Sequence, residues 1–153
     1  MIISFFGHSM VLPYDKYEDK VMKLLEDVSK GQHVDFYLGG YGNFDAFGLQ
    51  CAKQFKKKHP DSKILLICPY IGKWLDNQKD YIKTCYDGTI YPEIEHVPLK
   101  FAIVKRNEWM VRQADYIIAY VFKHHGGAYK ALLYANKHNT PYTNLYEGNY
   151  ELY

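Results

Sequence analysis

Short runs of apolar residues alternate along the chain with segments in which apolar residues recur every three or four positions. Continuous runs of this length are typical of strands buried on both faces, and the second spacing is typical of helices with one buried face. The predicted strands cover residues 2–6, 34–38, 64–68, 116–121 and 142–145, and the predicted helices cover residues 17–28, 44–55, 71–85, 99–114 and 128–135. Residues 89–97 contain Pro92 and precede Pro98, which favours an edge or a loop, and we expect an ordered connection there.

Strands that alternate with helices predict right-handed βαβ units and a sheet covered on both sides. We therefore expect residues 1–153 to form a single Rossmann-like α/β domain, with a mostly parallel sheet and helices on both faces. A chain of this size buries roughly 68–70% of its unfolded surface, which suffices for one core. In open sheets of this kind, ligands bind beyond the carboxyl ends of the strands.

Composition narrows the class of protein. Hydrophobic residues make up 48% of the chain and charged residues 24%, which is typical of an ordered globular domain. The net charge of +2 is too small for a general nucleic-acid binder. No apolar run approaches the roughly 20 residues that span a bilayer, and no signal peptide is recognisable, so we expect a cytoplasmic protein without membrane contact. The 16 tyrosines favour a homodimer or a larger homo-oligomer.

Cysteine and histidine positions give no pattern of a metal site. Cys51, Cys68 and Cys85 are odd in number and unpaired in sequence, which indicates reduced, buried thiols. We expect no metal and no cofactor, because neither the histidine spacing nor any cluster of acids resembles a ligand set.

Glycines stand where three predicted strands end. Gly39-Gly40 and Gly126-Gly127 each precede a predicted helix, and Gly7 ends the first apolar run. Glycine lets a ligand approach the backbone, and the N-terminus of a helix attracts phosphate or carboxylate oxygens. The candidate ligand-binding residues in these turns are Gly7, His8, Ser9, Gly39, Gly40, Tyr41, Gly42, Gly126, Gly127 and Ala128. Neither turn fits the GxGxxG pattern of dinucleotide-binding sites. Isolated glycine pairs are also common in strand-to-helix turns that bind no ligand.

Arg106 and Asn107 fall in the middle of a helical face that Ile103, Met110 and Ala114 make apolar. A buried guanidinium requires an anionic or carbonyl-rich partner, and its planar fork matches phosphate well. We therefore add Arg106 and Asn107 to the candidate ligand-binding residues. The alternative is an internal salt bridge from Arg106 to an acid such as Asp45.

Asp45 is the candidate catalytic residue if the protein is an enzyme. Its place in the first turn of a predicted helix is favoured by the helix dipole whatever the function. A carboxylate there could also hold ribose hydroxyls or assist cleavage of an N-glycosidic bond. Tyr41 and Tyr129 could stack on a base. His8, His124 and His125 all follow strands, so they could line the same mouth of the sheet or be solvent-exposed bystanders.

Several motifs together resemble the SLOG superfamily of Rossmann-like nucleotide-ligand proteins, whose relatives include the YpsA and DprA proteins and the LOG phosphoribohydrolases. The resemblance covers most of the chain, and the chain looks most like the small bacterial SLOG proteins. It rests on residues 105–111, 114–116 and 126–128, and it extends back through residues 89–92 and 39–42. The resemblance implies a ligand over the glycine turns, with Arg106 as the basic residue on the phosphate side.

The chain departs from the motif of the LOG hydrolases, which runs Gly-Gly-x-Gly-Thr-x-x-Glu and uses the acid to cleave the bond between base and ribose. After Gly126-Gly127 the chain has Leu132 and Leu133 where that acid would stand. The first turn keeps an acid, Asp45, but lacks the threonine. This departure argues against hydrolysis and leaves binding intact.

The sequence thus favours a protein that binds or senses a nucleotide or nucleotide-derived, phosphate-bearing ligand. The main alternative is an N-glycosidase or phosphoribohydrolase that acts on a nucleoside monophosphate or related nucleotide. A weaker alternative is a structural interaction protein, which would lack a pocket.

Overall fold

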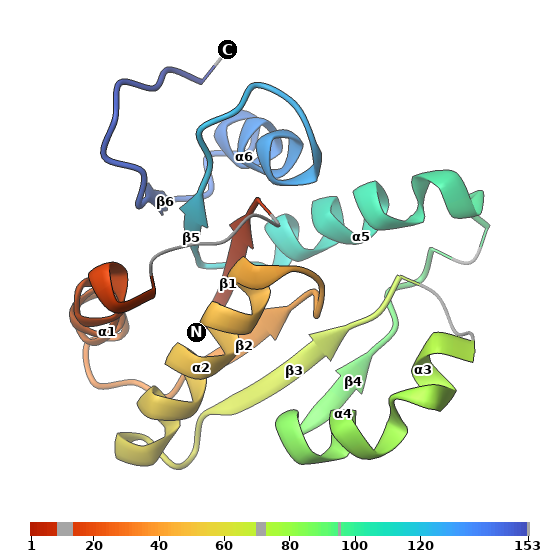
Figure 1. Ribbon diagram of the computed structural model, residues 1–153, viewed down its shortest axis with the longest axis horizontal. Coiled ribbons are helices and arrows are strands. Elements are labelled where there is room, and N and C mark those ends of the chain that lie inside the picture. Colours follow the sequence, from red (N-terminus) through yellow and green to blue (C-terminus); the bar gives the residue numbers. More distant parts are fainter. Residues whose placement is uncertain (9–13, 70–72, 95, 153) are drawn as a thin grey trace.

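One six-stranded sheet organises the protein, and every pair of neighbouring strands in it is parallel. The computed structural model describes residues 1–8, 14–69, 73–94 and 96–152 (Figure 1). The strand order is β4-β3-β2-β1-β5-β6. The strands are β1 (Ile2–Gly7), β2 (Asp35–Leu38), β3 (Lys63–Ile67), β4 (Gly88–Ile90), β5 (Tyr116–Tyr120) and β6 (Tyr142–Asn144). The expected Rossmann-like α/β class is confirmed.

Helices connect the strands and cover both faces of the sheet (Figure 1). They are α1 (Tyr14–Ser29), α2 (Asn43–Lys58), α3 (Lys73–Asn77), α4 (Lys79–Cys85), α5 (Leu99–Gln113) and α6 (Gly127–Lys137). Because side chains alternate along a strand, Phe5 of β1 packs with α1 and α2, whereas its neighbour Phe6 packs with α5 and α6. The central strand therefore joins two apolar cores, one on each face.

The order of the strands creates a switch point beside β1. The chain leaves β1 through α1 toward β2 on one side, and β5 pairs with β1 on the other, where Ile3 lies opposite Tyr116. The connections at the carboxyl ends of β1 and β5 diverge there, which is where open parallel sheets bind ligands. The sheet topology thus brings Gly7 and the glycine turns that follow β2 and β5 together at the carboxyl ends of the strands.

Two connections differ from the prediction. Gly88–Ile90 forms a short edge strand paired with residues 65–67 of β3, and its last two residues lie where we expected only an ordered connection. Pro92 lies beyond this strand, so its missing N–H does not interrupt the ladder. The helix expected over residues 71–85 breaks at Gln78, whose N–H donates to the carbonyl of Leu75, and two short helices result.

The cysteines and the helix lengths add two further findings. Cys51 and Cys68 are buried and Cys85 is half-buried, and all three are free thiols. Within the described ranges, no helix is both long enough and apolar enough to cross a bilayer.

Candidate functional site

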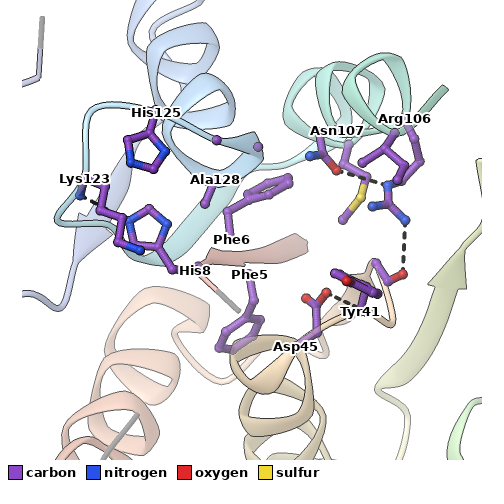
Figure 2. Close-up of a pocket in the computed structure, with 16 residues that line it drawn as sticks. Phe5, Phe6, His8, Tyr41, Asp45, Arg106, Asn107, Lys123, His125 and Ala128 are labelled. Carbon is purple, nitrogen blue, oxygen red and sulfur yellow. Dashed lines mark hydrogen bonds between the residues drawn. The ribbon is translucent and has the colours of Figure 1, made fainter. Parts of the chain in front are cut away.

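A cavity of about 340 Å³ opens at the carboxyl ends of β1, β2 and β5, and α5 forms one of its walls (Figure 2). It runs from the β2–α2 turn, across the end of β1, to the β5–α6 turn. The residues that line it are Phe5, Phe6, Gly7, His8, Gly39, Tyr41, Asp45, Ile103, Arg106, Asn107, Met110, Lys123, His125, Gly126, Gly127 and Ala128. The lining includes apolar side chains such as Phe6 and polar ones such as Asp45 and Lys123. The cavity therefore suits a ligand that has an apolar part and a polar part.

Glycines begin both helices that point at the cavity. Gly42 precedes α2 with a φ of 90°, Gly126 precedes α6 with a φ of 93°, and neither helix has a side-chain hydrogen bond at its cap. A side chain at either position would be strained because L-residues rarely adopt such φ values. A Cβ added at Gly127 would meet only the Asn107 amide nitrogen, at 3.5 Å. The α6 end of the cavity thus exposes backbone N–H groups that an anion can reach.

Arg106 holds the α5 wall against the ends of two strands. The residue is 6% exposed, and its Nη1 donates to the carbonyl oxygens of Gly39 at 3.0 Å and Ile67 at 3.1 Å. Its Nε donates to Oδ1 of Asn107 at 3.0 Å (Figure 2). The expected carbonyl-rich surroundings of this guanidinium are therefore confirmed. A Cβ at Gly39 would lie 3.1 Å from the guanidinium carbon, so the glycine permits this close approach.

Asp45 lies in the first turn of α2, and its carboxylate faces the cavity (Figure 2). Its Oδ2 accepts a hydrogen bond of 3.0 Å from the N–H of Tyr41. Burial raises the pKa of Asp45 from 3.8 to about 6, although the Tyr41 N–H, the charge of Arg106 and the Gly39 N–H all act to lower it. A carboxyl with a pKa near neutrality is typical of a functional group rather than a surface acid.

We expect the Asp45→Asn variant to gain stability relative to the parent protein as pH rises from 4.5 to 7.5. The pKa of Asp45 is higher folded than unfolded, so its stabilising contribution is full below pH 3.8 and is lost as pH rises through 6. Asparagine does not titrate and keeps an acceptor for the Tyr41 N–H. The Asp45 side chain is half-buried, so water screens part of this effect. The gain in stability relative to the parent should therefore be about 1–2 kcal/mol.

Urea unfolding at the two pH values measures this difference in the free energy of unfolding. Asp27→Asn, which removes an exposed acid of α1, is the matched control and should show no such gain. A pH-independent difference between Asp45→Asn and the parent would contradict the raised pKa.

The β5–α6 turn brings basic side chains to the opposite side of the cavity. Lys123 and His125 line it there, and His8 fixes the turn because its Nε2 accepts the N–H groups of Phe122 at 3.1 Å and Lys123 at 3.2 Å. Accepting these bonds requires an unprotonated Nε2. Consistently, burial, and then the charges of Lys123 and His125, lower the pKa of His8.

The C-terminal segment also packs on this turn. The Tyr150 hydroxyl donates to the carbonyl of Lys123 at 2.8 Å, and the ring of Tyr150 stacks on His124. His124 Nε2 hydrogen-bonds the carbonyl oxygen of Glu151 at 2.8 Å. The turn is therefore held from both sides, by His8 and by the C-terminal segment.

Most of the candidate residues from the sequence meet at this one cavity. Those that line it are Gly7, His8, Gly39, Tyr41, Asp45, Arg106, Asn107, Gly126, Gly127 and Ala128. Gly40 and Gly42 shape the β2–α2 turn without lining the cavity, and a Cβ at Gly40 would lie 2.6 Å from Leu66 Cδ1. Ser9 lies outside the described residues. The assignment of these residues to ligand binding remains a prediction.

Sequence reasoning missed Lys123, and it left open whether His125 lines the site or is a solvent-exposed bystander. Both follow β5 by a few residues, which was the available signal. It also placed Ile103 in the buried face of α5, but this side chain is 50% exposed at the mouth of the cavity. No group of three or more His, Cys, Asp or Glu side chains within the described part of the chain is arranged to hold a metal ion.

Several solved structures share this fold. DprA from Streptococcus pneumoniae aligns with 92% of this chain at 17% identity and a TM-score of 0.63. DprA from Helicobacter pylori, described for its single-stranded DNA binding mode, aligns with 93% at 17% identity and a TM-score of 0.62. The protein TM1055 aligns with 92% at 14% identity and a TM-score of 0.57.

The chain spans 48% of the S. pneumoniae DprA, 63% of the H. pylori DprA and 71% of TM1055. In sequence, it is 27% identical over 141 residues to the SPbeta prophage-derived protein YoqJ of Bacillus subtilis strain 168, covering 80% of this chain and 81% of YoqJ. No family model matches the chain. The Rossmann-like fold that the SLOG resemblance implied is thus shared with solved structures of DprA and TM1055.

Proposed function

Starting from the Rossmann-like fold that this chain shares with DprA and TM1055, we propose that the protein binds or senses a nucleotide or nucleotide-derived, phosphate-bearing ligand. The ligand lies in the cavity at the carboxyl ends of β1, β2 and β5. The backbone N–H groups of the glycine turns, Lys123 and the charge of Arg106 attract its phosphate.

The observation that carries this proposal is the meeting of two glycine-capped helices and a buried guanidinium around one cavity. Fixed backbone donors and a permanent charge are the usual partners of phosphate. The volume of about 340 Å³ suits a ligand of nucleotide size. Such a cavity also speaks against a purely structural protein, which would not need one.

Thermal-shift screening with ribonucleotides, deoxyribonucleotides, cyclic dinucleotides, ADP-ribose and short single-stranded oligonucleotides tests the proposal. A ligand at one hundred times its dissociation constant stabilises the fold by about 2.7 kcal/mol, which is easily detected. Lys123→Ala should remove most of the shift, whereas Lys130→Ala, an exposed lysine of α6 outside the cavity, should not. No stabilisation by any compound of the set would refute the proposal.

The oligonucleotides belong in the screen because the H. pylori neighbour is described for binding single-stranded DNA. Stabilisation by oligonucleotides alone would replace a small nucleotide with a nucleic-acid strand as the ligand. The net charge of +2 leads us to expect the small ligand instead.

The raised pKa of Asp45 supports a second candidate, an N-glycosidase or phosphoribohydrolase. A carboxyl group with a pKa of about 6 can exchange a proton near neutral pH or stabilise charge at the sugar. This candidate predicts release of free base from a nucleoside monophosphate, and loss of that release in Asp45→Asn. Chromatography after long incubation measures it, and an intact nucleotide panel would exclude it.

A further inference from the structure

A second cavity lies at the opposite end of the strands from the first. It has a volume of about 300 Å³ and opens beside Ile64 at the start of β3, with the C-terminal parts of α2 and α4 on its sides (Figure 1). Four lysines from these two helices line it: Lys53, Lys56, Lys57 and Lys83. Among the described residues of the lining, Asp87 is the one acid. The whole chain has a net charge of only +2, so basic side chains are concentrated here.

The carboxylate of Asp87 is already engaged within the protein. Its Oδ1 accepts a hydrogen bond from Nζ of Lys56 at 2.6 Å, and its Oδ2 accepts one from the N–H of Ile64 at 2.8 Å. Burial alone would raise the pKa of Asp87, but these two hydrogen bonds and the charges of nearby lysines lower it. Asp87 is therefore ionised, and it neutralises Lys56 rather than the other three lysines.

The other three lysines leave the cavity with an excess of positive charge. Among the described residues, no acid forms an ion pair with Lys53, Lys57 or Lys83. Besides Asp87, the C-termini of α2 and α4 contribute negative charge, about half an elementary charge each. Four ammonium groups outweigh these contributions, so the lining keeps a net charge of about +2. Like charges around one hollow repel each other, and a bound anion would relieve this repulsion.

The size and the charge of the cavity suit an anion larger than a single phosphate ion. A volume of about 300 Å³ lies at the lower end of the range for small-molecule sites, which leaves room for two or more phosphate groups. Lysine ammonium groups bind phosphate as point charges on flexible stems, so they need no preformed planar fork. An anion with two or more negative charges neutralises the lining.

We propose that this second cavity binds an anion that carries two or more linked phosphate groups, with Lys53, Lys57 and Lys83 as its partners. The phosphate oxygens take the place of the acids that these lysines lack. The proposal is independent of the nucleotide site, because the two cavities lie at opposite ends of the strands and share no lining residue. Free pyrophosphate and the diphosphate of a nucleotide have the same chemistry, and the test separates these two sources.

Calorimetry with pyrophosphate at constant ionic strength tests the site. In Lys57→Gln/Lys83→Gln, loss of two exposed ammonium contacts should weaken binding about tenfold. The matched control is Lys58→Gln/Lys79→Gln, which removes two exposed lysines of the same helices outside the cavity and changes the net charge equally. This control should retain the parent affinity within about twofold, because screening weakens the effect of distant charges. Equal losses in the two double variants, or no binding by the parent protein, overturn the proposal.

Lys123→Ala separates this site from the first cavity. Pyrophosphate binding that is lost in Lys123→Ala but kept in Lys57→Gln/Lys83→Gln belongs to the first cavity, which overturns the second site and leaves the proposed nucleotide binding intact. Amide chemical shifts of the parent protein give a readout that needs no variant. Pyrophosphate should shift the signals of Thr84 and Asp87, which line the second cavity, and a response confined to Gly126 and Gly127 contradicts the proposal.

ADP identifies the source of the phosphate groups. If ADP binding also weakens about tenfold in Lys57→Gln/Lys83→Gln, the site accepts the diphosphate of a nucleotide. If only pyrophosphate binding weakens in this variant, the site takes the free anion.

Discussion

Arg106→Ala is expected to lower the free energy of unfolding by about 2–4 kcal/mol and to weaken ligand binding at least tenfold. The guanidinium donates to the carbonyls of Gly39 and Ile67, so its removal leaves a void and deprives these carbonyls of a donor. It also releases α5 from the ends of β2 and β3. The binding loss follows from the missing positive charge and from the loosened wall.

Urea unfolding and calorimetry measure the two effects separately. Arg112→Ala is the matched control, because Arg112 lies on the same helix but is exposed. Its guanidinium donates a hydrogen bond to the Tyr134 hydroxyl rather than to the ends of two strands. Its stability should change by no more than about 0.5 kcal/mol. Arg106→Lys keeps the charge without the planar fork, so it should recover part of the binding. Equal behaviour of Arg106→Ala and Arg112→Ala would rule out the role assigned to Arg106.

Gly7→Ala should destabilise the fold by about 2–3 kcal/mol and lower the melting temperature by roughly 5–10 °C. The new Cβ would lie 2.3 Å from Cγ and 2.7 Å from Cβ of Phe44. These atoms sit close to the α2 backbone, and the Phe44 ring is 1% exposed, so it cannot swing away. Relief requires a shift of α2 away from β1.

Gly127→Ala provides the comparison in a thermal melt. This glycine begins α6, and an added Cβ would meet only the Asn107 amide nitrogen, at 3.5 Å. Its melting temperature should therefore stay close to that of the parent. A Gly7→Ala protein that melts at the same temperature as Gly127→Ala would mean that β1 and α2 are not packed as described.

Much of the fold follows from the sequence because strands buried on both faces appear as continuous apolar runs. The expected ends of β1, β2, β3, β5 and β6 lie within one residue of the observed ones. The edge strand β4 was missed because its few residues carry no such run and Pro92 follows closely. The break at Gln78 was missed because the apolar spacing continues through it.

The candidate site was only partly predictable, because some of its features depend on distant segments. Glycine turns and a guanidinium on an apolar face can be recognised locally. The position of Lys123 cannot, since Tyr150 and His8 fix that turn from elsewhere in the chain. Gly7 was expected to serve a ligand, and its lack of a side chain is explained by the Phe44 ring, a contact that no local pattern indicates.

The place of β1 at the centre of the sheet has a consequence for synthesis of the protein. β1 pairs with β2 on one edge, but its other edge pairs with β5, where Ile3 lies opposite Tyr116. At about 5–20 residues per second, a ribosome needs several seconds to add the intervening segment. During that time the nascent chain carries an apolar strand with an open edge, which is the kind of segment that holdase chaperones shield and that misassembles at high expression rates.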